Sequence, residues 1–134
     1  MPSPLPSTLP PSFGAVAGAR RGLDVDLSDP RVVAFADQFA VDVSRIDGAL
    51  RAGFLEATGP SAFTAVQAIY VDDFWPRVPA VLGGTDWPDA ESTDADLWPL
   101  LEEFMREVAR LDALDPVTTE LVRLRCASYH DCHT

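Results

Sequence analysis

The sequence has few basic residues for its length. It contains 10 Lys and Arg against 21 Asp and Glu, which gives a net charge of −11 over 134 residues. Nucleic acids and anionic membranes attract proteins that carry a basic surface. We therefore expect neither a nucleic acid nor a membrane among the partners. The acids are spread along the chain, which favours an ordinary solvated surface.

Long apolar runs are also lacking. None approaches the roughly 18–20 residues that a membrane-spanning helix needs. The chain does not open on the charged and then apolar pattern of a signal peptide. These absences make a cytoplasmic location the default expectation.

Cysteine is scarce, since Cys126 and Cys132 are the only two. Two thiols do not make the disulfide framework of a small secreted protein. On one continuous helix, six residues apart, they would be separated by about 9 Å along the axis. A disulfide tolerates a Cα separation of roughly 7 Å at most, so the two could pair only if the helix breaks between them.

What the sequence does contain predicts one domain with a modest core, because 134 residues with 47% apolar content are ordinary for a small globular protein. Residues 1–13 hold five prolines and are expected to be extended, and residues 14–28 form an ordered lead-in. We therefore divide the chain into an N-terminal segment, residues 1–28, that is Pro-rich and largely irregular, and a helical domain, residues 29–134.

Apolar residues recur every three or four positions through most of residues 29–134, which is the period of an amphipathic helix. Asp-Pro pairs at 29–30 and 115–116 are helix starts, because Asp caps the first turn and Pro fits its first position. Further helices are expected from Ser44 and Asp47 to Gly59, from near Ser61 to Pro76, and around Leu97–Leu111. No segment alternates with period two. The fold class predicted is all-α, an antiparallel bundle of about five helices.

Three of these helices carry apolar stripes that the bundle is expected to bury. The first has apolar residues every three or four positions, at Val32, Phe35, Phe39, Val43 and Ile46. The third helix has Phe63, Val66, Tyr70 and Phe74 at helical spacing. The last has Val117, Leu121, Leu124 and Ser128 on one stripe.

The residues that could carry chemistry lie at the C-terminal end, where an acid, two thiols and two imidazoles fall close together. A peroxide-reducing cysteine must be a thiolate, which a helix N-terminus or a nearby base favours. Asp131 could cap a new helix with Cys132 at its first position. Glu120 borders the apolar stripe of the last helix and is expected to be partly buried, and burial lets a carboxyl group relay protons.

The residues Glu-Leu-Val-Arg-Leu-Arg at 120–125, with a cysteine twelve positions after the Glu, are similar to the signature of the carboxymuconolactone decarboxylase / alkylhydroperoxidase D-like family. Residues 30–82 resemble the helices that follow the cysteine motif in that family. The resemblance implies an alkylhydroperoxidase D-like helical fold. It also implies that Glu120 belongs to a proton relay and that Cys132 is the first cysteine of a Cys-x-x-Cys pair.

The resemblance further implies thiol-dependent peroxide reduction, an antioxidant activity. The family's carboxymuconolactone decarboxylases generally lack the cysteine pair, so Cys132 favours the peroxidase. The second cysteine and the following histidine of the motif would fall after Thr134, so the chain matches a truncated member and is expected to have little activity alone. The family implies a homo-oligomer, and the chemistry a thiol reductant or redox partner protein. No cofactor is expected.

Other interpretations of the same residues stay open. Glu120 and Arg123 have the i,i+3 spacing of a surface salt bridge, and Cys126 has the position of a small core residue. On a continuous helix Cys126, His130 and His133 would share one face and could ligate zinc; otherwise the two histidines are supporting groups at most. A non-catalytic module for oligomerisation or interaction is the alternative from another class.

Overall fold

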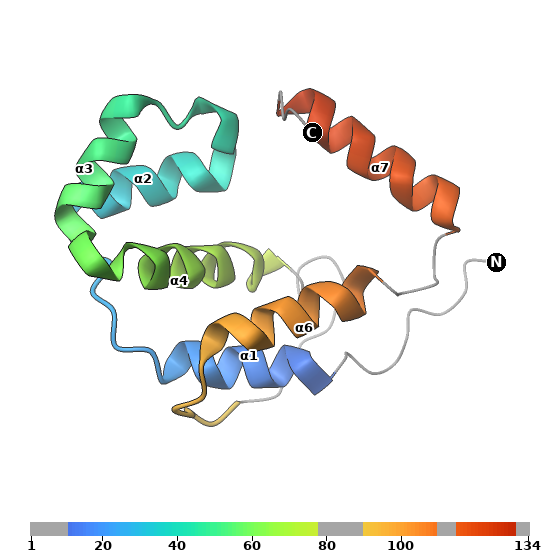
Figure 1. Cartoon of the computed structure of the whole chain (residues 1–134), viewed down its shortest axis with the longest axis horizontal. Helices are drawn as coiled ribbons and strands as arrows, with labels where there is room; N and C mark the ends of the chain where they lie inside the picture. Colours follow the sequence, from blue (N-terminus) through green and yellow to red (C-terminus); the bar gives the residue numbers. More distant parts are fainter. Residues whose placement is uncertain (1–10, 78–89, 110–114, 131–134) are drawn as a thin grey trace. The chain divides into compact units, whose positions relative to one another are not determined.

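The computed structural model describes residues 11–77, 90–109 and 115–130, and within these ranges the secondary structure is helical, with no strand (Figure 1). The α-helices are α1 (Pro11–Arg21), α2 (Pro30–Val41), α3 (Gly48–Thr58), α4 (Ala62–Phe74), α6 (Leu97–Ala109) and α7 (Pro116–Tyr129). Two short 3-10 turns, η1 (Val43–Arg45) and η2 (Gly59–Ser61), flank α3. The prediction of the all-α class is confirmed. None of the described helices is both long enough and apolar enough to cross a membrane.

Aspartates begin three of these helices, each by accepting a hydrogen bond from a backbone N–H of the first turn. Asp29 and Asp115 do so directly before the prolines that open α2 and α7, as the Asp-Pro pairs predict. Asp47 caps α3. A single helix starting at Ser44 is wrong, because Ser44 lies in η1. Gly59 ends α3 with φ of 55°, a left-handed conformation that favours glycine.

Contacts divide the chain into two compact units. Unit 1 is formed by Met1–Val25 and Val66–Ala113, and unit 2 by Asp26–Ala65 and Leu114–Thr134. This division differs from the predicted one at residue 28, because α1 packs against α6, far along the chain.

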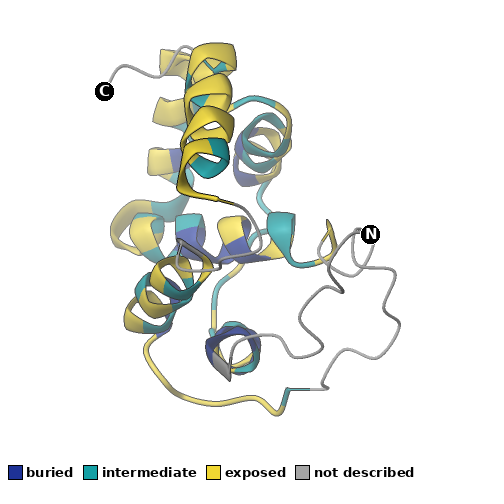
Figure 2. Cartoon of the chain, turned by 90° about the vertical axis from the view of Figure 1, so that its right-hand side faces the viewer, coloured by how far each residue is buried: buried dark blue, intermediate teal, exposed yellow. Residues whose placement is uncertain are grey.

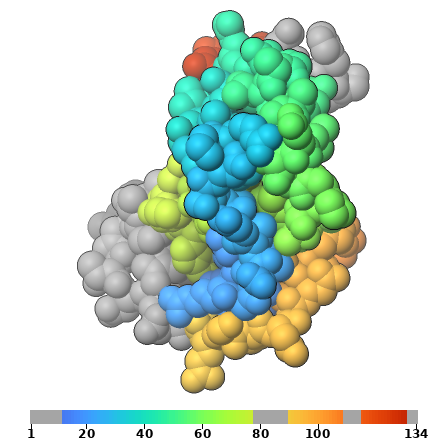
Figure 3. Space-filling view, turned by 90° about the vertical axis from the view of Figure 1, so that its left-hand side faces the viewer, coloured from blue at the N-terminus to red at the C-terminus, as the bar shows by residue number. Residues whose placement is uncertain are grey.

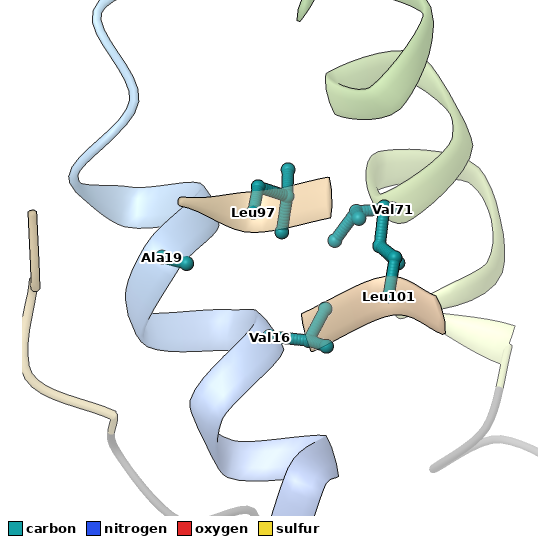
Figure 4. Packing of buried hydrophobic residues seen from close by; sticks show 5 residues of the cluster. All are labelled: Val16, Ala19, Val71, Leu97 and Leu101. Atoms are coloured by element: carbon teal, nitrogen blue, oxygen red, sulfur yellow. The ribbon is translucent and has the colours of Figure 1, made fainter. Parts of the chain in front are cut away.

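Unit 1 holds a core between α1, α6 and the C-terminal part of α4. Figure 4 shows its five central side chains pointing toward one another: Val16, Ala19, Val71, Leu97 and Leu101. Aromatic rings extend this core. The ring of Phe13, which is 1% exposed, stacks on Trp75 with centroids 3.7 Å apart, and Phe74 stacks on Phe104 at 5.4 Å.

Helix α1 is the main departure from the sequence-based fold. Irregular structure was expected through residue 28, and this is wrong for residues 11–21, which form a helix with Phe13, Val16 and Ala19 buried. The glycines of this stretch lower its intrinsic helix propensity. Tertiary packing overrides that propensity, because the helix buries one apolar face against α6.

Gly18 in α1 and Gly22 directly after it permit a close approach by the segment before α6. The backbone N–H of Thr93 donates to the carbonyl oxygen of Gly18 at 3.0 Å. A Cβ on Gly18 would lie 2.7 Å from the Glu91 carbonyl oxygen, and a Cβ on Gly22 would lie 1.7 Å from that of Thr93. Side chains at these two positions would therefore push the segment off α1.

Unit 2 is built on the pairing of α2 with α3. Phe35 on α2 stacks on Phe54 on α3, with ring centroids 4.1 Å apart, and Val32 is buried. The atoms of the two helices lie directly against each other in the space-filling view (Figure 3). The apolar spacing predicted this buried face of α2 correctly.

Helix α4 has the predicted extent but buries a different face. Phe63 is exposed and Tyr70 is at the border of exposure, although both were placed on the core stripe. Ala65, Ala68 and Ile69 are buried instead. Small side chains let a neighbouring backbone approach closely, whereas a tyrosine keeps its hydroxyl near water. Side-chain size therefore determines which face of α4 is buried.

Candidate functional site

Helix α7 carries the residues that the sequence singled out, and it is the most exposed helix of unit 2. Figure 2 shows it almost entirely in the colour of exposed residues, and none of its side chains is buried. The predicted stripe of Val117, Leu121 and Leu124 forms on the helix but is 69%, 61% and 57% exposed. The expectation that this stripe lies in the core is therefore wrong.

Glu120 lies beside that stripe and faces water. Its side chain is 55% exposed and accepts a hydrogen bond from Nη1 of Arg123 at 2.9 Å. The expected partial burial of Glu120 is wrong, and the i,i+3 surface salt bridge is what the structure shows. Such a pair stabilises a helix by about 0.2–0.5 kcal/mol. The proton-relay role of Glu120 stays a prediction.

Cys126 is a free, exposed thiol. Its interpretation as a packed core residue is wrong, because the side of α7 that it occupies is not covered by another described helix. An exposed thiol is open to reagents and oxidants, so Cys126 is an accessible sulfur rather than a structural one.

Cys132 and His133 lie outside the described residues. Helix α7 ends at Tyr129, and His130 is its C-cap, with its backbone N–H bonded to the carbonyl of Cys126. The continuous helix from Cys126 to His133 that the zinc interpretation assumed is therefore wrong. The helix does end between the two cysteines, which is the condition for pairing them.

His130 has a partner that the sequence analysis missed. Its Nδ1 lies 2.9 Å from Oδ1 of Asp42, 88 residues earlier, and the two side chains are 31% and 20% exposed. Both residues belong to unit 2. No sequence signal joins them, because contacts over such a separation depend on how the helices pack.

Asp42 is placed by its own turn. It follows α2 and caps η1, where its carboxylate accepts hydrogen bonds from the backbone N–H and the hydroxyl of Ser44. The hydroxyl of Ser44, followed by the imidazole of His130, lowers the pKa of Asp42 to about 2. The carboxylate is thus an ionised acceptor at neutral pH, and the proton of the shared hydrogen bond belongs to Nδ1 of His130.

The described part of the site is a set of exposed groups on one helix, with the imidazole of His130 held at its end. Glu120, Cys126 and His130 are all on or next to α7, where Glu120 pairs with Arg123 and His130 contacts Asp42. Within residues 11–77, 90–109 and 115–130, no group of three or more His, Cys, Asp or Glu side chains is placed to hold a metal ion.

The chain has relatives among known proteins. It is 44% identical over 112 residues to Uncharacterized protein MT2376 of Mycobacterium tuberculosis strain CDC 1551 / Oshkosh, and equally to Uncharacterized protein Rv2313c of strain H37Rv. The match covers 75% of this chain and 39% of each relative, so the chain spans about two fifths of the length of these proteins. No family model matches the chain. No solved structure matches it either.

Proposed function

We propose that the chain is a carboxymuconolactone decarboxylase / alkylhydroperoxidase D-like protein, that it acts in the cytoplasm, and that α7 forms one wall of a thiol-redox site for peroxide reduction. The motif from Glu120 to Cys132 carries the proposal. Helix α7 supports it by forming over the predicted residues, with Asp115 as its cap.

The chemistry needs two sulfurs. A thiolate of Cys132 attacks one peroxide oxygen, the O–O bond breaks, and the cysteine becomes a sulfenic acid while an alkoxide or hydroxide leaves and takes up a proton from water. A second thiol then displaces water to form a disulfide, which an external dithiol reduces. This chain offers only Cys126 as the second thiol, so we expect little turnover from the chain alone.

Glu120 is not in a relay environment in the isolated chain, because its carboxylate faces water and pairs with Arg123. The proposal therefore includes assembly. The exposed stripe of Val117, Leu121 and Leu124 is the surface that a second copy covers. Covering the stripe removes water beside Glu120, and a carboxyl group shielded from water in this way is suited to relay protons.

The redox part is tested with one equivalent of cumene hydroperoxide and a sulfenic acid probe, read by mass spectrometry of the peptides that hold each cysteine. Cys126 is the control within the same molecule, since it is an exposed thiol without the motif. We expect Cys132 to be labelled about tenfold faster. Equal labelling of both cysteines would contradict the redox proposal.

The second candidate is a non-catalytic assembly module, favoured by the same exposed stripe. Light scattering at tens of micromolar is expected to show an oligomer that Leu121→Arg dissociates. Val33→Arg on α2, at an exposed apolar residue outside the stripe, is the matched control. An oligomer whose two cysteines are labelled at equal rates favours the assembly module. A monomer contradicts the assembly that both proposals include.

A further inference from the structure

The exposed stripe of α7 has the spacing of a coiled-coil seam. Val117, Leu121 and Leu124 are followed by Ser128, so the stripe advances by four, three and four residues. This is the spacing of positions a and d in a heptad repeat, with Leu121 and Ser128 at a and the other two at d. All four side chains are exposed. Two helices with this spacing can interlock their side chains along the seam.

Opposite charges lie on the two sides of this stripe. In the same heptad, Glu120 is at position g on one side and Arg125 is at position e on the other, and both are exposed. In a parallel pair of helices, the residue at g of one helix meets the residue five positions later, at e of the second helix. Glu120 and Arg125 are five positions apart, so two copies of α7 side by side would form this ion pair twice.

Reversing one of the two helices removes the match. In an antiparallel pair, position g meets g and position e meets e. Glu120 would then face Ala127 of the second copy, and Arg125 would face Thr118, neither of which is charged. The charges beside the stripe therefore favour one direction of pairing, which is the usual role of residues at e and g.

We propose that two copies of this chain pair through α7, parallel and in register, with Glu120 of each copy bound to Arg125 of the other. This pairing rests on the assembly included in the proposed function, and it adds the direction and the charged contacts. The same surface of α7 serves in both copies, as in the two-fold symmetric dimers that are commonest among oligomers. The seam has few layers and one of them is a serine, so the dimer is expected to be weak and to depend on concentration.

The salt bridge within α7 is compatible with this pairing. Arg123 donates to Oε2 of Glu120 at 2.9 Å and lies at position c, outside the seam. A carboxylate accepts several hydrogen bonds. Arg125 of the second copy can therefore bind the same carboxylate while Arg123 stays in place.

The charged contacts are tested by reversing them. The dissociation constant of the dimer is measured by sedimentation equilibrium at low ionic strength, at tens to hundreds of micromolar protein. Arg125→Glu turns both contacts into like-charge contacts and should raise the dissociation constant about tenfold. The double variant Glu120→Arg with Arg125→Glu exchanges the charges and should restore it.

Arg123→Glu is the matched control, since it makes the same change of charge on the same helix but outside the seam. It should leave the dissociation constant within about twofold of that of the unchanged chain. A dimer that responds equally to Arg125→Glu and Arg123→Glu, or that the double variant does not restore, overturns the proposed contacts.

The direction of pairing is tested by a disulfide at Ser128→Cys, in a chain that also carries Cys126→Ser and Cys132→Ser. In the parallel pair the two new cysteines face each other, and mild oxidation should join them. In an antiparallel pair they would be about 16 Å apart along the axis, which is beyond the roughly 7 Å that a disulfide spans. An antiparallel pair would instead join this variant to a Val117→Cys variant mixed with it, as mass spectrometry of the linked peptides would show.

These outcomes separate the pairing from the proposed function. A dimer that forms the mixed disulfide but not the disulfide between two copies of Ser128→Cys overturns the parallel pairing and leaves assembly standing. A monomer over the whole concentration range overturns both. Selective labelling of Cys132 by the sulfenic acid probe does not depend on either result, so the redox proposal stands or falls separately.

Discussion

Helices α1 and α7 make an instructive comparison because both contain a proline at the start and both consist largely of small and apolar residues. Phe13, Val16 and Ala19 on α1 are at most 1% exposed, whereas α7 has no buried residue. Two glycines within α1 make it the poorer helix former. Helix formation in this protein therefore rests on packing in α1, and on the cap and local sequence in α7.

The largest difference between the two helices is expected in the free energy of unfolding when a buried side chain of α1 is removed. Phe13→Ala should lower the free energy of unfolding by about 3–5 kcal/mol, since Phe13 is 1% exposed and stacks on Trp75. Leu121→Ala on α7 should change it by less than about 0.5 kcal/mol in dilute protein, where the stripe stays in water. Urea unfolding followed by circular dichroism measures both. A Leu121→Ala cost as large as that of Phe13→Ala would show that α7 is packed.

The next largest effect concerns the segment that crosses α1. Gly22→Ala should cost about 1–3 kcal/mol, because its Cβ would meet the Thr93 carbonyl oxygen at 1.7 Å. Gly14→Ala, inside α1 and with nothing within 4 Å of the added Cβ, should stabilise by about 0.5–1 kcal/mol. Thermal unfolding compares the two variants. Equal effects of the two alanines would contradict the close approach.

A smaller difference is expected in acid, where α7 should lose stability before α1 does. The hydroxyl of Thr118 lowers the pKa of Asp115, the cap of α7, below its ordinary value. A carboxyl group with a lowered pKa in the folded state stabilises it above the unfolded pKa of about 3.8, and that contribution is lost as the pH falls further. Helix α7 should therefore fray before α1 between pH 4 and pH 2, as amide exchange by helix can show. Asp115→Asn should flatten this response; simultaneous loss of both helices in both proteins would contradict it.

The smallest effect is expected at Glu120. Glu120→Gln should lower the free energy of unfolding by less than about 0.5 kcal/mol, because the ion pair with Arg123 is solvated. Arg123→Gln and the double variant complete a cycle that isolates the pair. A coupling well above 1 kcal/mol would mean that Glu120 is buried in solution, as its proposed relay role requires after assembly.

Much of the fold could be predicted from local signals. The Asp-Pro pairs at 29–30 and 115–116 located two helix starts, and Gly59 located a helix end, because caps and left-handed residues act within a few positions. The buried face of α2 followed from its apolar spacing. The face of α4 did not, since spacing alone did not show that small alanines would be covered and Phe63 would not.

Less of the candidate site could be predicted. The motif drew attention to α7 and its groups, but not to their exposure, because a helical stripe looks the same whether or not another element covers it. The Asp42–His130 contact could not be found from the sequence at all, since it joins residues 88 positions apart.

By itself the sequence determined the helical class, the helix ends marked by aspartate, proline and glycine, and the chemical groups available near the C-terminal end. These depend on interactions between residues a few positions apart. Only the tertiary structure decided that residues 11–21 become a buried helix, that the stripe of α7 faces water, and which carboxylate holds His130. Those outcomes depend on which surfaces meet, and burial can outweigh the local preference of any one segment.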